Sequence, residues 1–409
     1  FSRNYYQEGA LRYNKLGATW YASTPPEEMT YQSGDLKLNF SQTHLTVNRL
    51  GDSISILGTA GTFHALENVW NGQGGEVSWK RYGRPDISVT LGAYTIDMTK
   101  SGYEAREVAL SYPDYFPNKT ISGQFEDKAT TLRDSAQTGS YPRFYSRDSL
   151  LQVQNIGEGI SFQGSIRLQG TTLYGIGNRR SPAEIQIFDQ RGQKVFRGLS
   201  QNFIIRQGER IASKDVSSTL YFGNDSLFHP SLIMRYDIPE RTFNLQRNAE
   251  GSGRNPFFDS YHQVNIKAES MDWIVGTDSL IVGKQSIGFN EEVGQAVFES
   301  LNFFNEGDYR RLQNIGSYNP IATFARVARE QGQENLQAEL LAQELNPRFN
   351  QTSIQSLLFD MTEEGFVEYD SETGRVNIKD KTLHYAKASL GRTDYDALRI
   401  LSSAGNKTN

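Results

Sequence analysis

Four polar residues close behind a glycine-rich turn are the best candidates for chemistry in this 409-residue chain. The turn is at 251–253, and the candidates that follow it are Arg254, Asp259, His262 and Glu269, with Tyr261 among them. Two carboxylates, or one basic residue beside a groove, are what glycoside hydrolysis or polysaccharide cleavage requires. The same stretch is also typical of an ordinary hairpin in which Tyr261 packs and the charged side chains are solvated. Both interpretations stay open.

Other catalytic and ligand-binding patterns are missing from the sequence. No two of the five histidines have the spacing of a zinc ligand pair, and the lack of cysteine excludes disulfides, thiolate metal sites and a cysteine nucleophile. The glycine clusters complete neither a dinucleotide fingerprint nor a phosphate loop, and no Gly-x-Ser-x-Gly elbow occurs. The sequence therefore predicts no metal and no cofactor, and it favours a protein that is not an enzyme.

A run of aromatic residues offers a second possible contact with sugars. It consists of Tyr112, Tyr115, Phe116 and Phe125. Exposed rings could stack on a sugar, but the nearby Pro113 and Pro117 favour a rigid loop that tucks the rings onto a sheet.

Charge and composition limit the partners and the compartment. The chain has 47 acidic and 42 basic residues, so it lacks the cationic excess that binding to nucleic acid requires. No apolar run is long enough for a transmembrane helix. The first residue, Phe1, indicates either a mature product after leader removal or a part of a longer chain. A composition rich in Tyr, Asn, Gln and Gly resembles periplasmic and outer-membrane-associated proteins of Gram-negative bacteria, so we expect an extracytoplasmic location.

Alternation with a period of two dominates residues 34–283. Leu36, Leu38 and Phe40 alternate with polar residues, and strands recur at the spacing typical of sandwiches, barrels and solenoids. This pattern predicts a mainly β body of stacked antiparallel strands, either a β-solenoid or groove or a sandwich. The loop-like stretch 128–142 divides it into β-rich regions at 1–127 and 143–283.

Two hairpins are predicted with particular turns. One joins 184–188 to 194–197 through Asp189 to Gly192, and the other joins 232–236 to 242–246 through Asp237 to Glu240. Glycine in the first turn and proline in the second suit the required backbone dihedrals.

The period changes in the C-terminal region, 284–409. Helical spacing predicts helices over 321–328 and 336–345, and a third helix that is capped by Thr352 or Ser353 and ends at Gly365. A hairpin follows over 366–379, with its turn at 370–374.

This order of three helices and a hairpin over 319–381 resembles the winged-helix family. In DNA-binding members the third helix reads the major groove with basic and amide side chains. Here that helix carries Asp360, Glu363 and Glu364 and has no Arg or Lys. We therefore predict that these residues, together with Tyr369 of the hairpin, contact a protein and not nucleic acid.

These patterns favour a non-enzymatic scaffold or binding component of the bacterial cell envelope that acts through protein–protein contacts. One alternative is a carbohydrate-active enzyme or sugar-binding module on a β-helix or sandwich. Another is a lipid-conducting periplasmic β-groove, so that a polysaccharide or a lipid is a possible ligand.

Overall fold

The structure, a computed structural model, describes residues 5–7, 10–15, 18–32, 34–49, 51–130, 141–277, 279–283, 296–312 and 319–402. The chain divides into two compact units, which we describe separately. Unit 1 comprises Phe1–Ala183 and Phe203–Gln207, and unit 2 comprises Glu184–Asn202 and Gly208–Asn409. As predicted, the chain is mainly β and its strands pair in antiparallel fashion. Most of the predicted boundary loop at 128–142 lies outside the described residues.

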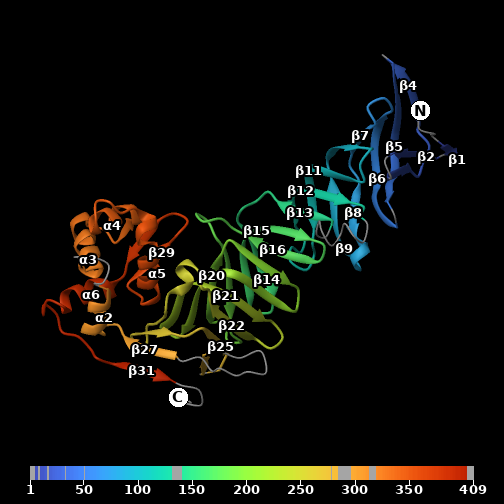
Figure 1. The fold of residues 1–409 in the computed structure, drawn as a ribbon. Coiled ribbons are helices and arrows are strands. Elements are labelled where there is room, and N and C mark those ends of the chain that lie inside the picture. Colours follow the sequence, from blue (N-terminus) through green and yellow to red (C-terminus); the bar gives the residue numbers. More distant parts are fainter. Residues whose placement is uncertain are drawn as a thin grey trace. The chain divides into compact units, whose positions relative to one another are not determined.

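The described part of unit 1 is built from antiparallel strands and one short 3-10 helix (Figure 1). Its last strand, β19, comes from a separate segment of the chain. Its elements are β1 (Tyr5–Gln7), β2 (Ala10–Lys15), β3 (Ala18–Ala22), β4 (Glu28–Gln32), β5 (Asp35–Arg49), β6 (Asp52–His64), β7 (Val69–Gln73), β8 (Glu76–Trp79), η1 (Lys80–Tyr82), β9 (Arg84–Leu91), β10 (Ala93–Asp97), β11 (Gly102–Ser111), β12 (Thr120–Lys128), β13 (Arg143–Ser146), β14 (Leu151–Gly157), β15 (Ile160–Gln169), β16 (Thr172–Ile176) and β19 (Asn202–Arg206).

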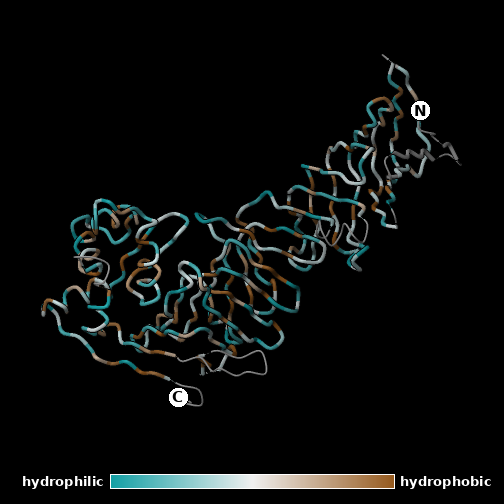
Figure 2. The backbone as a smooth tube through the Cα atoms, in the orientation of Figure 1, coloured by the Kyte–Doolittle hydropathy of each residue, from teal (hydrophilic) through white to brown (hydrophobic). Residues whose placement is uncertain are grey.

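The long strands of unit 1 change partner along their length. β6 pairs with β7 over its second half and meets β8 at Leu57. Between these branches Trp70 is fully buried, and its ring lies 5.3 Å from that of Phe40. Gly61 leaves room for the indole, because a Cβ there would be 2.5 Å from the Trp70 ring. Hydrophobic and hydrophilic positions alternate along the strands (Figure 2), as the sequence predicts.

The β part of unit 2 continues the same antiparallel pattern with longer hairpins. Its elements are β17 (Ala183–Phe188), β18 (Lys194–Ser200), β20 (Arg210–Phe222), β21 (Asp225–Asp237), β22 (Thr242–Arg247), η2 (Gly251–Arg254), β23 (Phe257–Asp259), β24 (Val264–Lys267), β25 (Ser270–Ile274), β26 (Leu280–Val282), β27 (Ala296–Ser300) and β31 (Arg399–Ser402).

Both predicted hairpin turns of this part are present. In the first, the Gly192 amide donates to the Asp189 carbonyl at 3.0 Å. In the second, β21 and β22 pair with Tyr236 opposite Phe243, the register that the predicted turn requires. These hairpins could be predicted because their strands and turns are adjacent in the sequence.

The helical part of unit 2 contains a small three-stranded sheet with helices around it. Its elements are α2 (Glu306–Arg311), α3 (Pro320–Gln331), β28 (Asn335–Gln337), α4 (Ala338–Leu345), η4 (Gln351–Ile354), α5 (Gln355–Glu363), β29 (Val367–Asp370), β30 (Arg375–Ile378) and α6 (Asp380–Ala388). The small sheet has the order β28-β30-β29.

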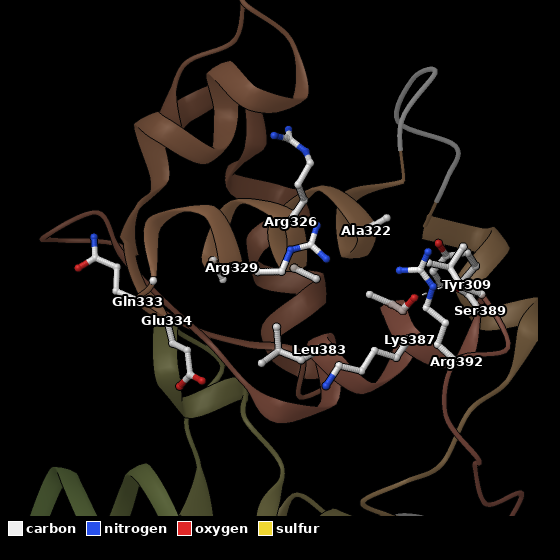
Figure 3. Close-up of a pocket in the computed structure, with 15 residues that line it drawn as sticks. Tyr309, Ala322, Arg326, Arg329, Gln333, Glu334, Leu383, Lys387, Ser389 and Arg392 are labelled. Carbon is white, nitrogen blue, oxygen red and sulfur yellow. Dashed lines mark hydrogen bonds between the residues drawn. The ribbon is translucent and has the colours of Figure 1, made fainter.

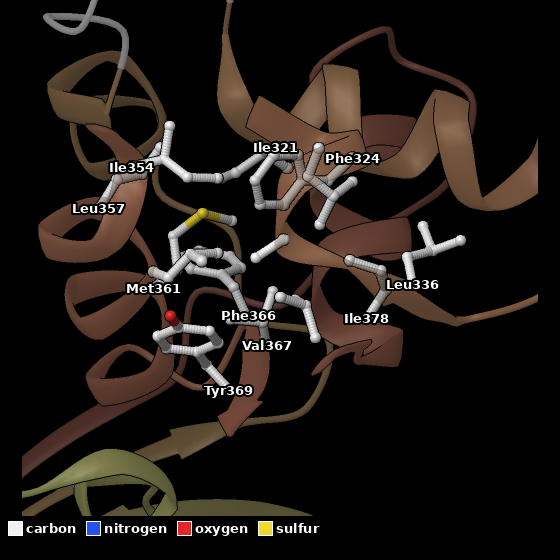
Figure 4. Close-up of a cluster of buried hydrophobic side chains, with 14 of the residues drawn as sticks. Ile321, Phe324, Leu336, Ile354, Leu357, Met361, Phe366, Val367, Tyr369 and Ile378 are labelled. Atoms are coloured by element: carbon white, nitrogen blue, oxygen red, sulfur yellow. The ribbon is translucent and has the colours of Figure 1, made fainter. Parts of the chain in front are cut away.

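The helical part has its own apolar core, shown in Figure 4. Phe324 of α3, Leu358 of α5 and Val376 of β30 are fully buried within it. The close-up shows side chains from helices and hairpin converging on one space, so the predicted apolar stripes do face inward.

Three details of the helical part differ from the sequence prediction. Leu336 begins no helix; it lies in β28 opposite Val376, a partner far along the chain. The predicted caps Thr352 and Ser353 lie in a 3-10 segment, η4, that precedes the third helix. Asn350 caps this segment, because its side chain accepts from the amide of Ser353, which returns a bond in a capping box, whereas α5 itself has no side-chain cap. The helices α2 and α6 were not predicted.

Candidate functional site

Two of the four residues predicted to do chemistry lie together. The Asp259 carboxylate accepts from the Tyr261 amide at 2.9 Å and lies 2.7 Å from Nδ1 of His262. The backbone turns sharply here, since Gln263 has a φ of 54°. The His262 side chain is 67% exposed, so this pair is an open surface turn.

The other two candidates have different neighbours. The Arg254 guanidinium lies 5.0 Å from the centre of the Phe359 ring, and its Nη1 is 3.9 Å from Glu363. Glu269 is exposed, and its carbonyl accepts from the Arg247 amide at 2.8 Å. Within the described ranges, no group of three or more acidic or histidine side chains is placed to hold a metal ion.

The aromatic run also lies inside the protein. Tyr112, Tyr115, Phe116 and Phe125 are at most 7% exposed. Their rings pack in the interior of unit 1 and present no platform to a sugar.

The acidic end of α5 is occupied by basic side chains of the same unit. Glu364 lies 2.5 Å from the Lys267 Nζ and 3.5 Å from the Arg311 guanidinium, and Glu363 faces Arg254. Of the remaining predicted partner-binding residues, Asp360 is exposed, whereas Tyr369 is fully buried. The Tyr369 hydroxyl accepts from the Gln351 amide at 3.1 Å.

A buried ionic cluster continues from this contact. Glu299, 1% exposed, lies 2.9 Å from Lys381, 3.0 Å from Arg399 and 3.5 Å from Lys267. Burial opposes ionisation of Glu299, but the surrounding cations outweigh it and hold its pKa below the usual value. The cluster therefore fastens the helical part to the β part of unit 2.

A groove of about 600 Å³ lies on the side of the helical part formed by α3 and α6 (Figure 3). Three alanines spaced three residues apart, Ala322, Ala325 and Ala328, place small side chains along one face of α3. Leu383 and Ala386 of α6 complete an apolar floor. Small side chains fill little of the space between the helices, which leaves the groove open.

The edge of this groove is basic. Its ionisable lining comprises Arg326, Arg329, Lys387, Arg392 and, as the one acid, Glu334. Arg326 is neutralised, because it lies 2.7 Å from Glu344 and 2.8 Å from Glu330. We call these residues and the apolar floor the basic groove.

The other three cations are available to a ligand. Arg329, Lys387 and Arg392 are exposed and form no ion pair with any residue that the structure describes. Figure 3 shows them projecting from α3, from α6 and from the segment after α6. An apolar floor beneath unpaired cations can bind an acidic, partly apolar segment.

Sequence reasoning missed this site because its cations come from positions about sixty residues apart that only the packing of α3 against α6 brings together. The local signal was the alternation of alanine and arginine from Ala322 to Arg329, which marks one small and basic helix face.

Comparisons with known proteins found no match that indicates a function. No protein-family model matches the chain, and neither a curated protein nor a solved structure matches it. None of the helices in the described part of the chain has the length and apolar character needed to cross a membrane.

Proposed function

We propose that the chain is a non-enzymatic binding component of the bacterial cell envelope, and that its basic groove holds an acidic segment of a partner protein. The proposal rests on three cations around the alanine floor of α3, Arg329, Lys387 and Arg392, which form no ion pair with any described residue. Such cations can form charge-assisted hydrogen bonds with the acidic side chains of a peptide, and the apolar floor can bury its apolar side chains. The groove therefore favours an acidic amphipathic peptide.

We further propose that the helical part is a winged-helix-like module adapted to protein contact. The order α3, β28, α4, α5, β29, β30 supports this assignment. The third helix, α5, turns its acidic end to Lys267 and Arg254, so its contacts are with its own chain. The basic residues beside α5 are already paired with its acids and do not favour a phosphate backbone, whereas the groove on α3 and α6 stays accessible.

A peptide-binding measurement tests the groove directly. The probe is a fluorescent peptide of about 15 residues that alternates Asp and Glu with Leu at helical spacing, compared with a version in which Lys replaces the acids. We expect saturable binding of the acidic peptide alone, weakening as salt is added. The double substitution R329E/K387E should weaken it by at least about tenfold.

Arg348→Glu is the matched control. Arg348 is an exposed arginine of the same helical part and does not line the groove. If R348E weakens peptide binding as much as R329E/K387E does, general charge and not the groove accounts for the affinity. Equal binding of the acidic and the basic peptide would also overturn the proposal.

The envelope location is part of the proposal and needs its own test. Its support is the composition, rich in Tyr and Gly and without cysteine. Fractionation of the native bacterium, with detection by an antibody to this chain, should place it outside the cytoplasm. Recovery with a cytoplasmic marker would contradict the proposed location.

A further inference from the structure

Unit 1 contains a second groove at a place where two strands separate. β10 pairs with β7 over its whole length, from Ala93 to Asp97, but meets β11 only where Thr95 lies opposite Glu104. β11 is also irregular between Ala105 and Val108. A space of about 810 Å³ opens beside these strands and the end of β12. We call it the polar groove.

The polar groove has no excess of either charge. Four acidic side chains line it, and four basic ones balance them; the acids are Asp97, Glu104, Glu126 and Asp127. Several of these charges are paired within the unit, for example Lys100 with Asp97 at 3.3 Å. This balance does not favour a polyanion or an anionic lipid surface, in contrast to the basic groove.

Two carboxylates lie side by side in this groove. Glu104 of β11 is directly opposite Glu126 of β12, and side chains in such pairs are close neighbours. Glu126 also lies 3.7 Å from Arg143. Burial raises the pKa of Glu126 by more than the attraction of Arg143 lowers it, and repulsion by Glu104 adds to the rise. Like charges placed opposite each other weaken a sheet, so the pair contributes nothing to stability that explains its presence.

A buried hydroxyl gives an independent indication of a ligand. Tyr103 lines the groove and is 7% exposed, and its hydroxyl has no hydrogen-bond partner among the described residues. An unsatisfied buried hydroxyl costs stability. A polar ligand in the groove would supply the missing partner.

We propose that the polar groove binds a neutral oligosaccharide. Sugar hydroxyls both donate and accept, which suits a lining that mixes carboxylates, Arg106 and the Tyr103 hydroxyl. The ring of Tyr141 is also in the lining. The Arg143 guanidinium covers one of its faces, at 4.3 Å from the ring centre, so a sugar would pack on the opposite face. The groove lies entirely in unit 1, so this inference is independent of the peptide site in unit 2.

Calorimetric titration of the whole chain tests the proposal. The probes are maltohexaose, cellohexaose and chitohexaose, with hexagalacturonic acid as a charged comparison. We expect at least one neutral hexaose to bind with a Kd of about 1 mM or lower, and hexagalacturonic acid to bind more weakly. Lack of binding by all three neutral probes, or preference for the charged one, would overturn the proposal.

Two variants tie binding to this groove. E104Q/E126Q keeps side-chain size but removes both charged acceptors, and should weaken binding by about tenfold. Tyr103→Phe should weaken it by about fivefold while raising the melting temperature, because an unsatisfied hydroxyl is removed. The control is Tyr115→Phe, at an equally buried tyrosine outside the groove. If Y103F raises stability but leaves binding unchanged, the hydroxyl does not contact the ligand and the proposal fails.

Discussion

The Lys381 ammonium lies 2.9 Å from the Glu299 carboxylate, and both side chains are almost completely buried. Lys381 also donates to the Glu364 carbonyl at 2.7 Å. The other cations around Glu299 have further acids available, since Arg399 lies 3.6 Å from Asp308 and Lys267 reaches Glu364. Among the described residues, Glu299 is the only acid that forms an ion pair with Lys381.

Glu299→Gln should therefore destabilise unit 2 by about 3 to 5 kcal/mol, because it leaves the Lys381 charge buried and uncompensated. The double variant Glu299→Leu/Lys381→Met should recover most of this loss, since apolar side chains of similar size replace both charges. Hydrogen exchange in β27 and α6, followed by mass spectrometry, measures the free energy of local opening.

Glu306→Gln serves as the control for this pair. Glu306 and Arg310 form an ion pair whose side chains are 67% and 71% exposed, so its loss should cost less than about 1 kcal/mol. If E299Q and E306Q have the same effect on exchange, the buried cluster does not fasten the helical part.

Two glycines at helix ends should respond differently to alanine. Gly332 after α3 and Gly365 after α5 both have left-handed backbone, with φ of 64° and 78°. A Cβ at Gly332 would meet nothing within 4 Å, whereas one at Gly365 would lie 3.0 Å from Pro256 of the β part. Gly332→Ala should cost about 1 kcal/mol from backbone strain alone. Gly365→Ala should cost about 2 to 4 kcal/mol, because the contact with Pro256 must also give way.

This difference can be tested by unfolding both variants with denaturant and measuring hydrogen exchange in α3 and α5. Equal losses would show that the β part moves aside freely at Gly365, and would argue against tight packing of α5 on Pro256.

Local patterns predicted much of the fold. The hairpin around Asp237 and the left-handed end of α5 at Gly365 are set by neighbouring residues, so the sequence was sufficient for them. Leu336 was wrongly assigned to a helix because its strand partner, Val376, lies forty residues away. The cap predicted at Thr352 or Ser353 was wrong for a local reason, because Asn350 bonds to Ser353 and caps the 3-10 segment before α5.

The candidate sites were harder to predict because they depend on packing between distant segments. The acidic residues Glu363 and Glu364 were expected to contact a protein, and the structure gives them basic neighbours within their own chain. Arg329 and Lys387 gain their common groove only when α3 packs on α6. Composition and charge could exclude classes of ligand, but they could not predict which distant residues form one surface.

His229 should make unit 2 sensitive to acid. It is 1% exposed, and its Nε2 lies 2.7 Å from the Asn255 carbonyl while Nδ1 accepts from the Ser231 amide at 3.1 Å. Burial lowers its pKa to about 3. The unfolded chain binds the proton near pH 6.5 and the folded chain does not, so stability is present above pH 6.5 and is lost as the pH falls toward 3.

The loss should approach about 4 kcal/mol over that range. His229→Gln, whose side chain stays neutral, should lower stability at neutral pH. It should also remove the decrease of stability with falling pH, as measured by hydrogen exchange in β21. His262→Gln, at the exposed histidine, should leave the slope intact. A wild-type slope that persists in H229Q would assign the acid sensitivity to other groups.

Asp127 should give unit 1 the opposite response. Its carboxylate is 3% exposed and lies 2.7 Å from the Arg81 guanidinium, yet burial outweighs this ion pair and raises its pKa to about 6. The folded unit then binds a proton that the unfolded chain releases near pH 3.8. Its contribution is fully present below pH 3.8 and is lost as the pH rises through 6, by about 3 kcal/mol.

Tryptophan fluorescence during urea unfolding reports this response, since three of the four tryptophans, Trp20, Trp70 and Trp79, lie in unit 1. The difference in unfolding free energy between the wild type and Asp127→Asn should decrease steadily from pH 4 to pH 7. Asp86→Asn is the control: hydrogen bonds from Arg84 lower the pKa of Asp86 below 3.8, so its contribution should stay constant from pH 4 to pH 7 and be lost only at lower pH. Parallel pH profiles for the wild type and D127N would show that Asp127 ionises alike in the folded and unfolded chain, and that its burial is relieved by water.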